Sequence, residues 1–414
     1  MSRSKAAHFV AVVCLWFSLY VYIPYQTPYL TGMGVAAGVV GTVIGAYGTM
    51  QIVLRVPLGV MADYLGRHRA IISAGVALGG AACVVRVLVP DEQGYLVANV
   101  VSGCAASTWI SFMVLYCQYY PPDRQQKATS TMIMACNLGM CLAFVFGTAL
   151  YGFGGMPLLC TAGAIAGFAG LAASAFIRQD EGFSRGDGRP AAAEGAPATD
   201  ATPEADAPAV RRDGMAAVRD LLSVCANRRL VLFSVLALVQ QGVQMSTAMS
   251  FTTQILQDEG ATAGFVGAAS VFYMVAAVAS AQFASTQRCA RRGPRFYVPL
   301  VFVLMGAYCV LVPAVGNIYV AFALQALPGM STGVLLSYLT SESMAGVPPE
   351  KNSTAMGFFQ AVYAVGMSLF PMIVGALAGW SSLGTGYAFL AAASVAGALA
   401  SGAHYAAEAR RLGR

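Results

Sequence analysis

Long apolar runs recur along this chain of 414 residues and limit what it can fold into. A bilayer core of about 30 Å is crossed by a helix of about 20 apolar residues, and the runs reach about that length. Only 10% of the residues are charged, whereas a soluble protein carries about 25%. The runs do not alternate polar with apolar residues, as barrel strands do. The sequence therefore predicts an all-α membrane protein with twelve transmembrane helices. These helices begin near His8, Val39, Ala70, Gly94, Ala128, Pro157, Arg229, Thr262, Phe296, Gly316, Ser353 and Leu383.

The basic residues lie on one side of this expected membrane. Apart from Arg55 and Arg86, which fall within helices, every Lys and Arg lies in a tail or in a loop that a cytoplasmic N-terminus would place inside. The opposite loops contain acids such as Asp91 and Glu92 but no Lys or Arg. Because cytoplasmic loops are enriched in Lys and Arg, we expect a multi-pass protein of the cell membrane (the inner membrane of a bacterium) with both termini cytoplasmic. The net charge of +6 follows from this distribution and does not indicate a nucleic-acid partner.

A polar segment divides the apolar runs into two groups of six. Residues 178–227 include a stretch rich in Ala, Pro, Gly and acids, a composition that does not fold by itself, so they are interpreted as a cytoplasmic linker. The flanking halves, 1–177 and 228–414, share a Gly-X-Val-Gly motif at Gly38–Gly41 and Gly264–Gly267. We therefore expect two six-helix bundles related by pseudo-symmetry.

The loop between the second and third runs carries the most specific motif of the chain. Two glycines, one Asp and two arginines follow one another there in a fixed order. This order resembles the signature loop between helices 2 and 3 of the major facilitator superfamily of membrane transporters. The resemblance implies two halves that rock about a central site, and a gating role for the loop. The predicted gating loop consists of Gly59, Asp63, Gly66, Arg67 and Arg69.

In that family the carboxylate of this loop latches the two halves in the outward-open state. Here Asp63 would face the N-terminus of helix 11 near Asn352 and Ser353, where free N–H groups and the helix dipole stabilise an anion. The corresponding segment of the second half, Ala281 to Arg295, has basic residues but no carboxylate. The latch is therefore expected in one intact copy.

The general pattern is similar to bacterial drug-efflux-like members, including Pro24 and Pro28, which should bend helix 1. Those members usually exchange protons and carry an Arg in helix 4 and a Gly-Pro pair in helix 5. Asn99 stands at the first position, and Ala143 and Phe144 stand at the second. Proton relays in bilayers normally use a buried carboxylate or His, and none is predicted mid-membrane. Proton coupling is therefore not indicated, and the coupling ion stays open.

Two arginines lie within helices. Arg86, near the outer end of helix 3, is expected to reach the surface beside Asp91 and Glu92. Arg55 lies about 12 Å inside the membrane, where an unpaired charge is costly. Arg55 should therefore face the cavity or a polar partner. Two roles remain open for it: attraction of an anionic group of the substrate, or a structural bond.

The family places its cavity between helices 1, 4, 7 and 10, with contributions from helices 2, 5, 8 and 11. Polar and aromatic side chains on these helices either bind solute or hold helices together. Amides and aromatic faces without acids favour a neutral or anionic, partly apolar solute over a strongly cationic one. The candidate substrate-binding residues are Tyr22, Gln26, Arg55, Asn99, Trp109, Asn137, Gln240, Gln244, Tyr338, Gln360 and Tyr363.

These observations predict secondary-active transport of a small organic solute by alternating access, and the resemblance favours efflux of a drug-like molecule or metabolite. Uptake or facilitated diffusion of an anionic nutrient, anchored by Arg55, is the alternative. A non-transporting sensor or scaffold would depend on the linker, which lacks the pattern of a folded domain. No catalytic set, metal cluster or phosphate loop indicates an enzyme or a cofactor. We expect a monomer whose partners are the solute, the lipid bilayer and an unassigned coupling ion.

The substitution Asp63→Asn tests the gating loop. It removes the charge that a helix N-terminus would stabilise, so we expect transport in proteoliposomes to slow by about 2- to 5-fold. The midpoint of thermal unfolding should stay at the wild-type value. Wild-type turnover in Asp63→Asn would contradict the latch.

Overall fold

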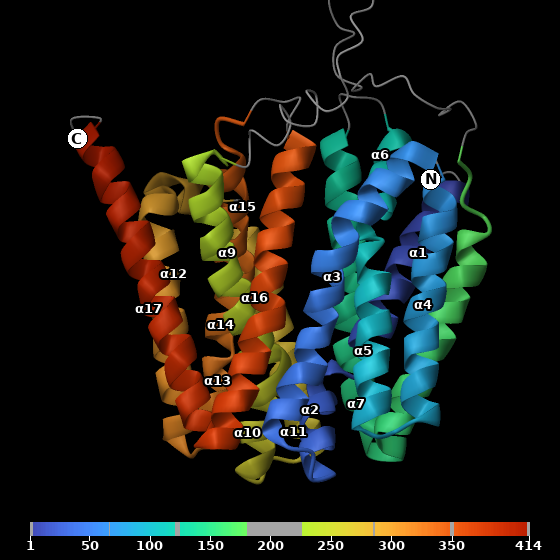
Figure 1. Ribbon diagram of the computed structural model, residues 1–414, viewed down its shortest axis with the longest axis horizontal. Helices are drawn as coiled ribbons and strands as arrows, with labels where there is room; N and C mark the ends of the chain where they lie inside the picture. The colour runs from blue at the N-terminus through green and yellow to red at the C-terminus, as the bar shows by residue number, and fades with distance from the viewer. Residues whose placement is uncertain are drawn as a thin grey trace, which may run out of the picture.

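The computed structural model describes residues 3–65, 67–120, 125–179, 226–284, 286–347 and 352–411. The regular elements in these residues are all helical, and they form two bundles that stand side by side, one from each half of the sequence (Figure 1). Both termini lie at the same end of the bundles, which is called the termini end below. The all-α prediction is confirmed, while most of the predicted linker lies outside the described residues.

The helices follow one another without strands in the described ranges. The N-terminal bundle consists of α1 (Arg3–Tyr20), α2 (Ile23–Gly32), α3 (Ala37–Leu65), α4 (His68–Leu88), α5 (Glu92–Ser107), α6 (Trp109–Gln118) and α7 (Gln125–Ser174). The C-terminal bundle consists of α9 (Arg228–Ser246), the π-helix η3 (Thr247–Phe251), α10 (Thr252–Asp258), α11 (Ala263–Ala284), α12 (Gln287–Val315), α13 (Ile318–Leu324), α14 (Ala326–Met330), the π-helix η4 (Ser331–Leu335), α15 (Leu336–Met344), α16 (Asn352–Trp380) and α17 (Leu383–Arg411).

The helix α7 accounts for two of the twelve expected spans. Taken as continuous helices, the described residues contain 11 segments long and apolar enough to cross a membrane. At 1.5 Å per residue a straight α7 of 50 residues would be about 75 Å long, far more than a bilayer requires. The chain turns inside it at Gly155, whose φ of 58° is left-handed and suits a glycine. Divided there, α7 supplies helices 5 and 6, and the described part of the chain has twelve spans.

Four spans are interrupted near the middle, and they are helices 1, 4, 7 and 10. Helix 1 turns at Tyr22 before Pro24, as the prolines predict, and helix 4 is divided at Thr108. Helices 7 and 10 each pass through a π-helical turn, η3 and η4. Interrupted helices and π-bulges occur frequently at functional sites because they release backbone groups and redirect side chains. The interruptions lie on the four helices that the resemblance places around the cavity.

The two bundles meet most closely along α3 and α16, which lie side by side in Figure 1. A Cβ atom on Gly41 would lie 2.3 Å from the carbonyl oxygen of Pro371, and one on Gly48 would lie 2.7 Å from the amide nitrogen of Ser368. The hydroxyls of Thr49 and Ser368 are hydrogen-bonded at 2.6 Å. Small residues let helices approach closely in a membrane, where packing rather than hydrophobic exclusion drives association.

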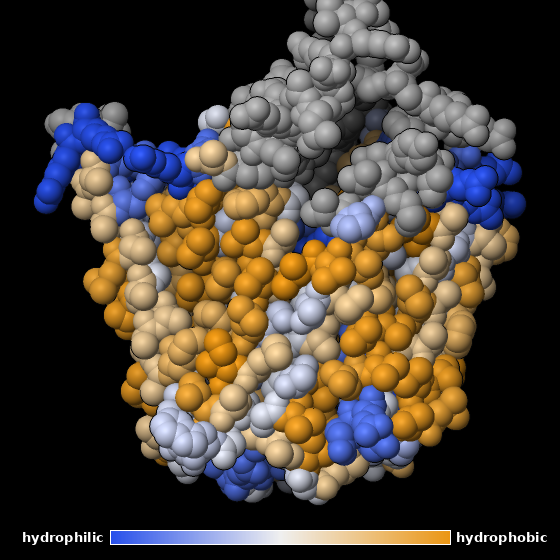
Figure 2. Space-filling view, viewed as in Figure 1, coloured by the Kyte–Doolittle hydropathy of each residue, from blue (hydrophilic) through white to orange (hydrophobic). Residues whose placement is uncertain are grey.

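The outer surface is suited to lipid. Figure 2 shows apolar residues across the middle of one face and hydrophilic residues toward its two ends. Large apolar side chains are widely exposed, for example Phe153 at 87%, Ile165 at 66% and Leu399 at 69%. A water-soluble protein rarely exposes so much contiguous apolar surface. The fold is therefore that of a multi-pass membrane protein.

The substitution Gly41→Ala tests the glycine contact. Because the added methyl group would meet backbone of α16, we expect the midpoint of thermal unfolding in detergent to fall, by an amount equivalent to about 1 to 3 kcal/mol. Gly402→Ala is the matched control, since a Cβ there has nothing within 4 Å. Its midpoint should stay the same or rise, because Ala is the better helix former. Equal midpoints for both variants would contradict the close approach of α3 and α16.

Candidate functional site

A small cavity lies between the bundles where helices 1 and 7 are interrupted. Tyr22, Ile23, Gln26, Ile44, Tyr47, Asn99, Met245 and Met249 line it. Its volume is about 10 Å³, which is about the space of one water molecule. In this arrangement the cavity between the two bundles is therefore too small for an organic solute. Such a solute can bind there only if the side chains of the two bundles move apart.

The polar part of the wall belongs to the N-terminal bundle. Tyr22, Gln26 and Asn99 are 1%, 4% and 3% exposed. The Nδ2 of Asn99 donates to the carbonyl oxygen of Val43 at 2.7 Å, which fixes the amide. The Oε1 of Gln26 has no hydrogen-bond partner among the described residues. The structure thus brings three of the predicted candidates together at one cavity.

Arg86 lies directly behind this polar wall, contrary to the expectation that it reaches the surface. It is 2% exposed. Its Nη2 donates to the hydroxyl of Tyr22 at 2.8 Å, to Oδ1 of Asn99 at 2.6 Å and to the hydroxyl of Ser102 at 3.1 Å. Its Cζ lies 3.8 Å from the centroid of the Tyr22 ring, in cation–π range. The expectation failed because Asp91, instead of pairing with Arg86, caps α5 by accepting from the amide of Gly94 at 2.8 Å.

The position of Arg86 also changes how the replacement of Arg by Asn at position 99 is interpreted. Drug-efflux-like members carry an Arg in helix 4, and Asn99 replaces it in this sequence. The structure nevertheless places a guanidinium group within hydrogen-bond distance of Asn99. It belongs to Arg86 on α4, which is the third membrane span. The sequence contained a signal for this, because Arg86 continues the buried stripe of α4. Its other members at helical spacing are Ile72, Val76, Gly79 and Cys83.

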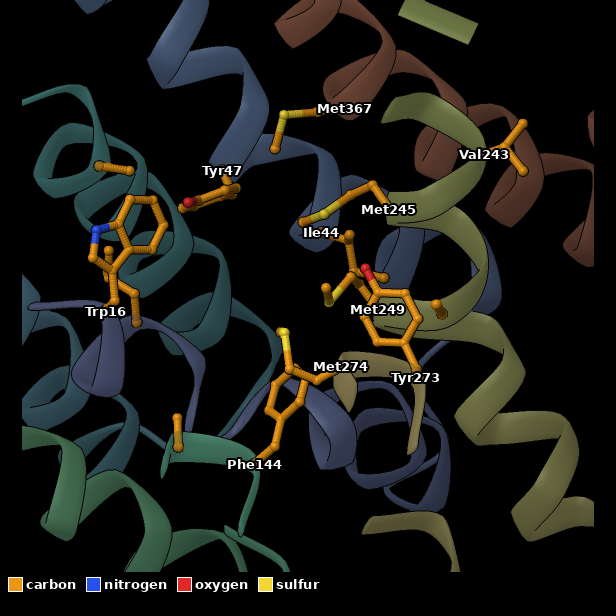
Figure 3. Close-up of a cluster of buried hydrophobic side chains, with 14 of the residues drawn as sticks. Trp16, Ile44, Tyr47, Phe144, Val243, Met245, Met249, Tyr273, Met274 and Met367 are labelled. Atoms are coloured by element: carbon orange, nitrogen blue, oxygen red, sulfur yellow. The ribbon is translucent and has the colours of Figure 1, made fainter. Parts of the chain in front are cut away.

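The part of the wall that the C-terminal bundle supplies is apolar, and Ile23 and Ile44 of the N-terminal bundle adjoin it. Figure 3 shows Met245, Met249, Met274 and Met367 grouped between Trp16 and Tyr47 on one side and Val243 on the other. Thioether side chains are flexible and polarisable, and they adapt to ligands of different shape. This wall contains no charge among its described residues. A solute between the bundles would therefore meet polar groups on one side and methionines on the other.

Gln240 and Gln244 belong to a network within the C-terminal bundle. The Nε2 of Gln240 donates to Oε1 of Gln244 at 2.9 Å and to Ser331 at 3.3 Å. The Nε2 of Gln244 donates to the hydroxyl of Tyr273 at 2.7 Å, which is hydrogen-bonded to Thr332 at 2.9 Å. These bonds link α9, α11 and η4, so this pair of amides holds helices together here.

Arg55 bridges the two bundles. Its Nη1 donates to Oε1 of Gln360 at 3.2 Å and to the hydroxyl of Tyr363 at 2.8 Å, both on α16. Its Nη2 donates to Oε1 of Gln51, one turn earlier on α3, at 2.6 Å. Arg55 is 7% exposed. These three bonds provide the polar partners that a buried guanidinium requires. The three candidates Arg55, Gln360 and Tyr363 form one inter-bundle cluster.

The remaining candidates are not joined to these groups by hydrogen bonds in the described residues. Trp109 packs edge to face on Trp16, with ring centroids 5.6 Å apart. Asn137 is half-buried in α7. The hydroxyl of Tyr338 lies 3.1 Å from Sγ of Cys289, which ties α15 to α12 inside the C-terminal bundle.

The predicted gating loop is described only in part. The side chains of Gly59 and Asp63, together with Gly66, lie outside the described residues, as do the side chains of Asn352 and Ser353. Arg67 is exposed. Arg69 donates through Nη2 to the carbonyl oxygen of Ala175 at 2.9 Å. The latch at Asp63 therefore stays a prediction.

An ion-pair cluster occupies the termini end of the C-terminal bundle. Arg229 contacts Glu342 at 2.5 Å and Glu408 at 3.4 Å, and Arg295 contacts Glu408 at 3.7 Å. The basic segment before Arg295 lacks its own carboxylate, as the sequence indicates, and α15 and α17 supply the acids. No group of three or more His, Cys, Asp or Glu residues is placed to hold a metal ion in the described ranges.

Comparison with known sequences agrees with this architecture. The sequence profile of the Major Facilitator Superfamily matches residues 9–371. A segment of 130 residues is 25% identical to the inner membrane transport protein YajR of Escherichia coli (strain K12). That segment covers 31% of this chain and 28% of YajR, so the chain aligns with less than a third of that relative.

Solved structures share the fold over nearly the whole chain. The nucleoside transporter NupG superposes with a TM-score of 0.72 at 14% identity, covering 98% of this chain and 99% of its own. A bacterial homolog of the human lysosomal transporter Spinster, in an inward-facing and unoccupied conformation, superposes with a TM-score of 0.69 at 16% identity, covering 98% and 96%. At these identities the likeness concerns the fold alone. Because the superfamily profile spans most of the sequence, the chain belongs to the Major Facilitator Superfamily and is a membrane transporter rather than an enzyme.

Proposed function

We propose that the chain carries a small organic solute across the cell membrane by alternating access, with the solute held in the central cavity. The observation that supports this most is the shared wall: Tyr22, Gln26 and Asn99 come from one bundle, and Met245 and Met249 come from the other. A solute that contacts both walls is transferred from one side to the other when the bundles tilt about it.

The arrangement of the bundles supports a state closed at the end opposite the termini. There α2, α10 and α11 lie together (Figure 1). The hydroxyl of Tyr25 donates to the carbonyl oxygen of Ala263 at 3.0 Å, and Thr27 and Ser250 are hydrogen-bonded at 3.0 Å. Both bonds join the two bundles, so both must break before this end can open.

The charge distribution supports a cytoplasmic location for the termini end. Apart from Arg55 and Arg86, the Lys and Arg residues lie in the sequence segments that the predicted topology assigns to the cytoplasmic side. With this orientation, the contacts of Tyr25 and Thr27 close the site toward the outside. Asp63 lies near the C-terminal end of α3. It is proposed to stabilise the other state, which is open toward the outside.

We favour efflux of a drug-like molecule or metabolite as the direction of transport. The resemblance to drug-efflux-like members supports it, and the adaptable methionine wall fits a solute with an apolar body. Uptake of an anionic nutrient is the second candidate. A specific observation supports that alternative, the buried cation of Arg86 behind the polar wall, and it replaces Arg55 as the anchor because Arg55 is engaged with α16.

Proteoliposomes test this function and its coupling. Suitable solutes are naphthalene-2-sulfonate, naphthalene-2-sulfonamide and uridine, each compared with protein-free liposomes. We expect the solute that moves fastest to cross at the same initial rate with and without a pH gradient. The reason is that the buried residues described in the spans include no Asp or Glu, and the buried histidines His8 and His68 lie near the start of α1 and α4 rather than in the middle of a span.

Two outcomes would contradict these expectations separately. A rate that rises several-fold with the gradient would show proton coupling and leave transport itself intact. The absence of protein-dependent movement for every solute would count against transport of these solute classes.

A further inference from the structure

We propose that Arg86 and Tyr22 together form an anion-recognition element, and that the substrates of the central site are amphipathic organic anions. The anionic oxygen group, a carboxylate or a sulfonate, lies against Tyr22 and Gln26, and the apolar body lies against Met245 and Met249. This inference rests on the proposed function, because it names the substrate class of the same cavity.

The first observation is a buried cation without a counterion. Arg86 is 2% exposed. None of the ion pairs found among the described residues includes it, and its three hydrogen-bond acceptors are the neutral groups of Tyr22, Asn99 and Ser102. A charge at this depth is costly unless something compensates it. A substrate anion would supply the missing negative charge.

The second observation is that Arg86 keeps unused donors. All three of its hydrogen bonds are made by Nη2, whereas Nε and Nη1 have no partner among the described residues. Arg55 differs, because both of its terminal nitrogens donate to side chains and only Nε is without a partner. Of the two arginines, Arg86 therefore has the larger unmet capacity to bind oxygen acceptors.

The third observation is the path from this cation to the cavity. Arg86 does not line the cavity itself, but Tyr22 does. The Tyr22 hydroxyl accepts from Arg86 at 2.8 Å and keeps its own proton to donate. A hydroxyl that accepts from a cation becomes a stronger donor, so the Tyr22 hydroxyl is the group through which Arg86 would act on an anion bound beside Tyr22. Arg86 is thus a positioning residue that acts through Tyr22.

Gln26 completes the polar wall one helical turn after Tyr22. Its Oε1 has no partner among the described residues, although the side chain is 4% exposed. A buried carbonyl oxygen without a partner is costly, and rotation of the amide would present its N–H groups to the cavity instead. An anionic oxygen group could then accept from Gln26 and Tyr22 together.

The opposite wall determines the rest of the ligand. Met245 and Met249 face the polar groups across the cavity, and Ile23 and Ile44 extend the apolar lining. Figure 3 shows further methionines close by, Met274 and Met367. Such a wall offers dispersion contacts and no polar partner, so the part of the ligand lying there is apolar. Methionine side chains can change rotamer to make room in a cavity that is about 10 Å³ in this arrangement.

The competing interpretation is that Arg86 is purely structural and ties α1, α4 and α5 together. The two interpretations differ in charge selectivity, which a structural bond does not produce. The probes are therefore pairs of equal shape and different charge. Benzenesulfonate, naphthalene-2-sulfonate and biphenyl-4-sulfonate are compared with their sulfonamides, and naphthalene-2-carboxylate with its carboxamide.

The experiment measures ligand-dependent shifts of the unfolding midpoint of the full chain in a neutral detergent, because a ligand that binds the folded state stabilises it. We expect at least one anion to bind wild type at least about ten-fold more tightly than its amide. Arg86→Gln should remove this preference, and Arg86→Lys should restore part of it. Arg55→Gln is the control of equal charge change, and it should retain the preference.

Tyr22→Phe serves as a second variant if Arg86→Gln does not fold. It removes the hydroxyl that links Arg86 to the cavity-lining residue Tyr22 and leaves the bonds from Arg86 to Asn99 and Ser102 in place. We expect it to lower the affinity for the anion several-fold and to leave the affinity for the amide unchanged.

The proposal is overturned if no anion in the series binds wild type more tightly than its amide, or if the Arg86 and Tyr22 variants keep the preference. The proposed function fails independently of it. An anion that binds but does not cross proteoliposomes would contradict transport and preserve the recognition element. An amide that crosses as fast as the anion would contradict the recognition element and preserve transport.

Discussion

The close approach of α3 and α16 is the contact on which the relation between the two bundles depends. Glycines on both helices remove the side chains that would hold them apart, and Thr49 meets Ser368 across the contact. Arg55 lies two turns further along α3 and adds bonds to Gln360 and Tyr363. In a membrane such a helix contact is stabilised by close packing rather than by the hydrophobic effect. It can therefore act as an axis about which the bundles tilt, while the contacts of Tyr25 and Thr27 open and close.

The two bundles contribute different chemistry to the space between them. The N-terminal bundle supplies amides, two phenols, two isoleucines and a buried guanidinium behind them, whereas the C-terminal bundle supplies methionines. Each half has interruptions in its first and fourth spans, so this difference lies in side chains rather than in the backbone plan.

Much of the architecture could be predicted from the sequence because lipid imposes simple requirements on length and polarity. The apolar runs predicted the twelve spans, and Pro24 predicted the interruption of helix 1. The depth of Arg55 predicted that it would find a polar partner, but the sequence did not show whether the partner would be a solute or another helix. The answer, Gln360 and Tyr363, depends on which helix packs against α3. Arg86 was misplaced because proximity to Asp91 along the chain outweighed the buried stripe on which it lies. Long-range packing, which no local pattern records, decided the partners of Arg55, whereas the helical spacing of the α4 stripe did indicate a buried Arg86.

The aromatic pair of Trp16 and Trp109 has a consequence for how the protein can be observed. The chain has 3 tryptophans. Two of them, Trp16 and Trp109, meet edge to face with centroids 5.6 Å apart, while Trp380 is 82% exposed on the outer surface. With Trp380 exchanged for Phe, the tryptophan emission of the protein would come from this pair alone. The molecule thus contains an intrinsic optical reporter of events at its centre, one that needs no attached dye.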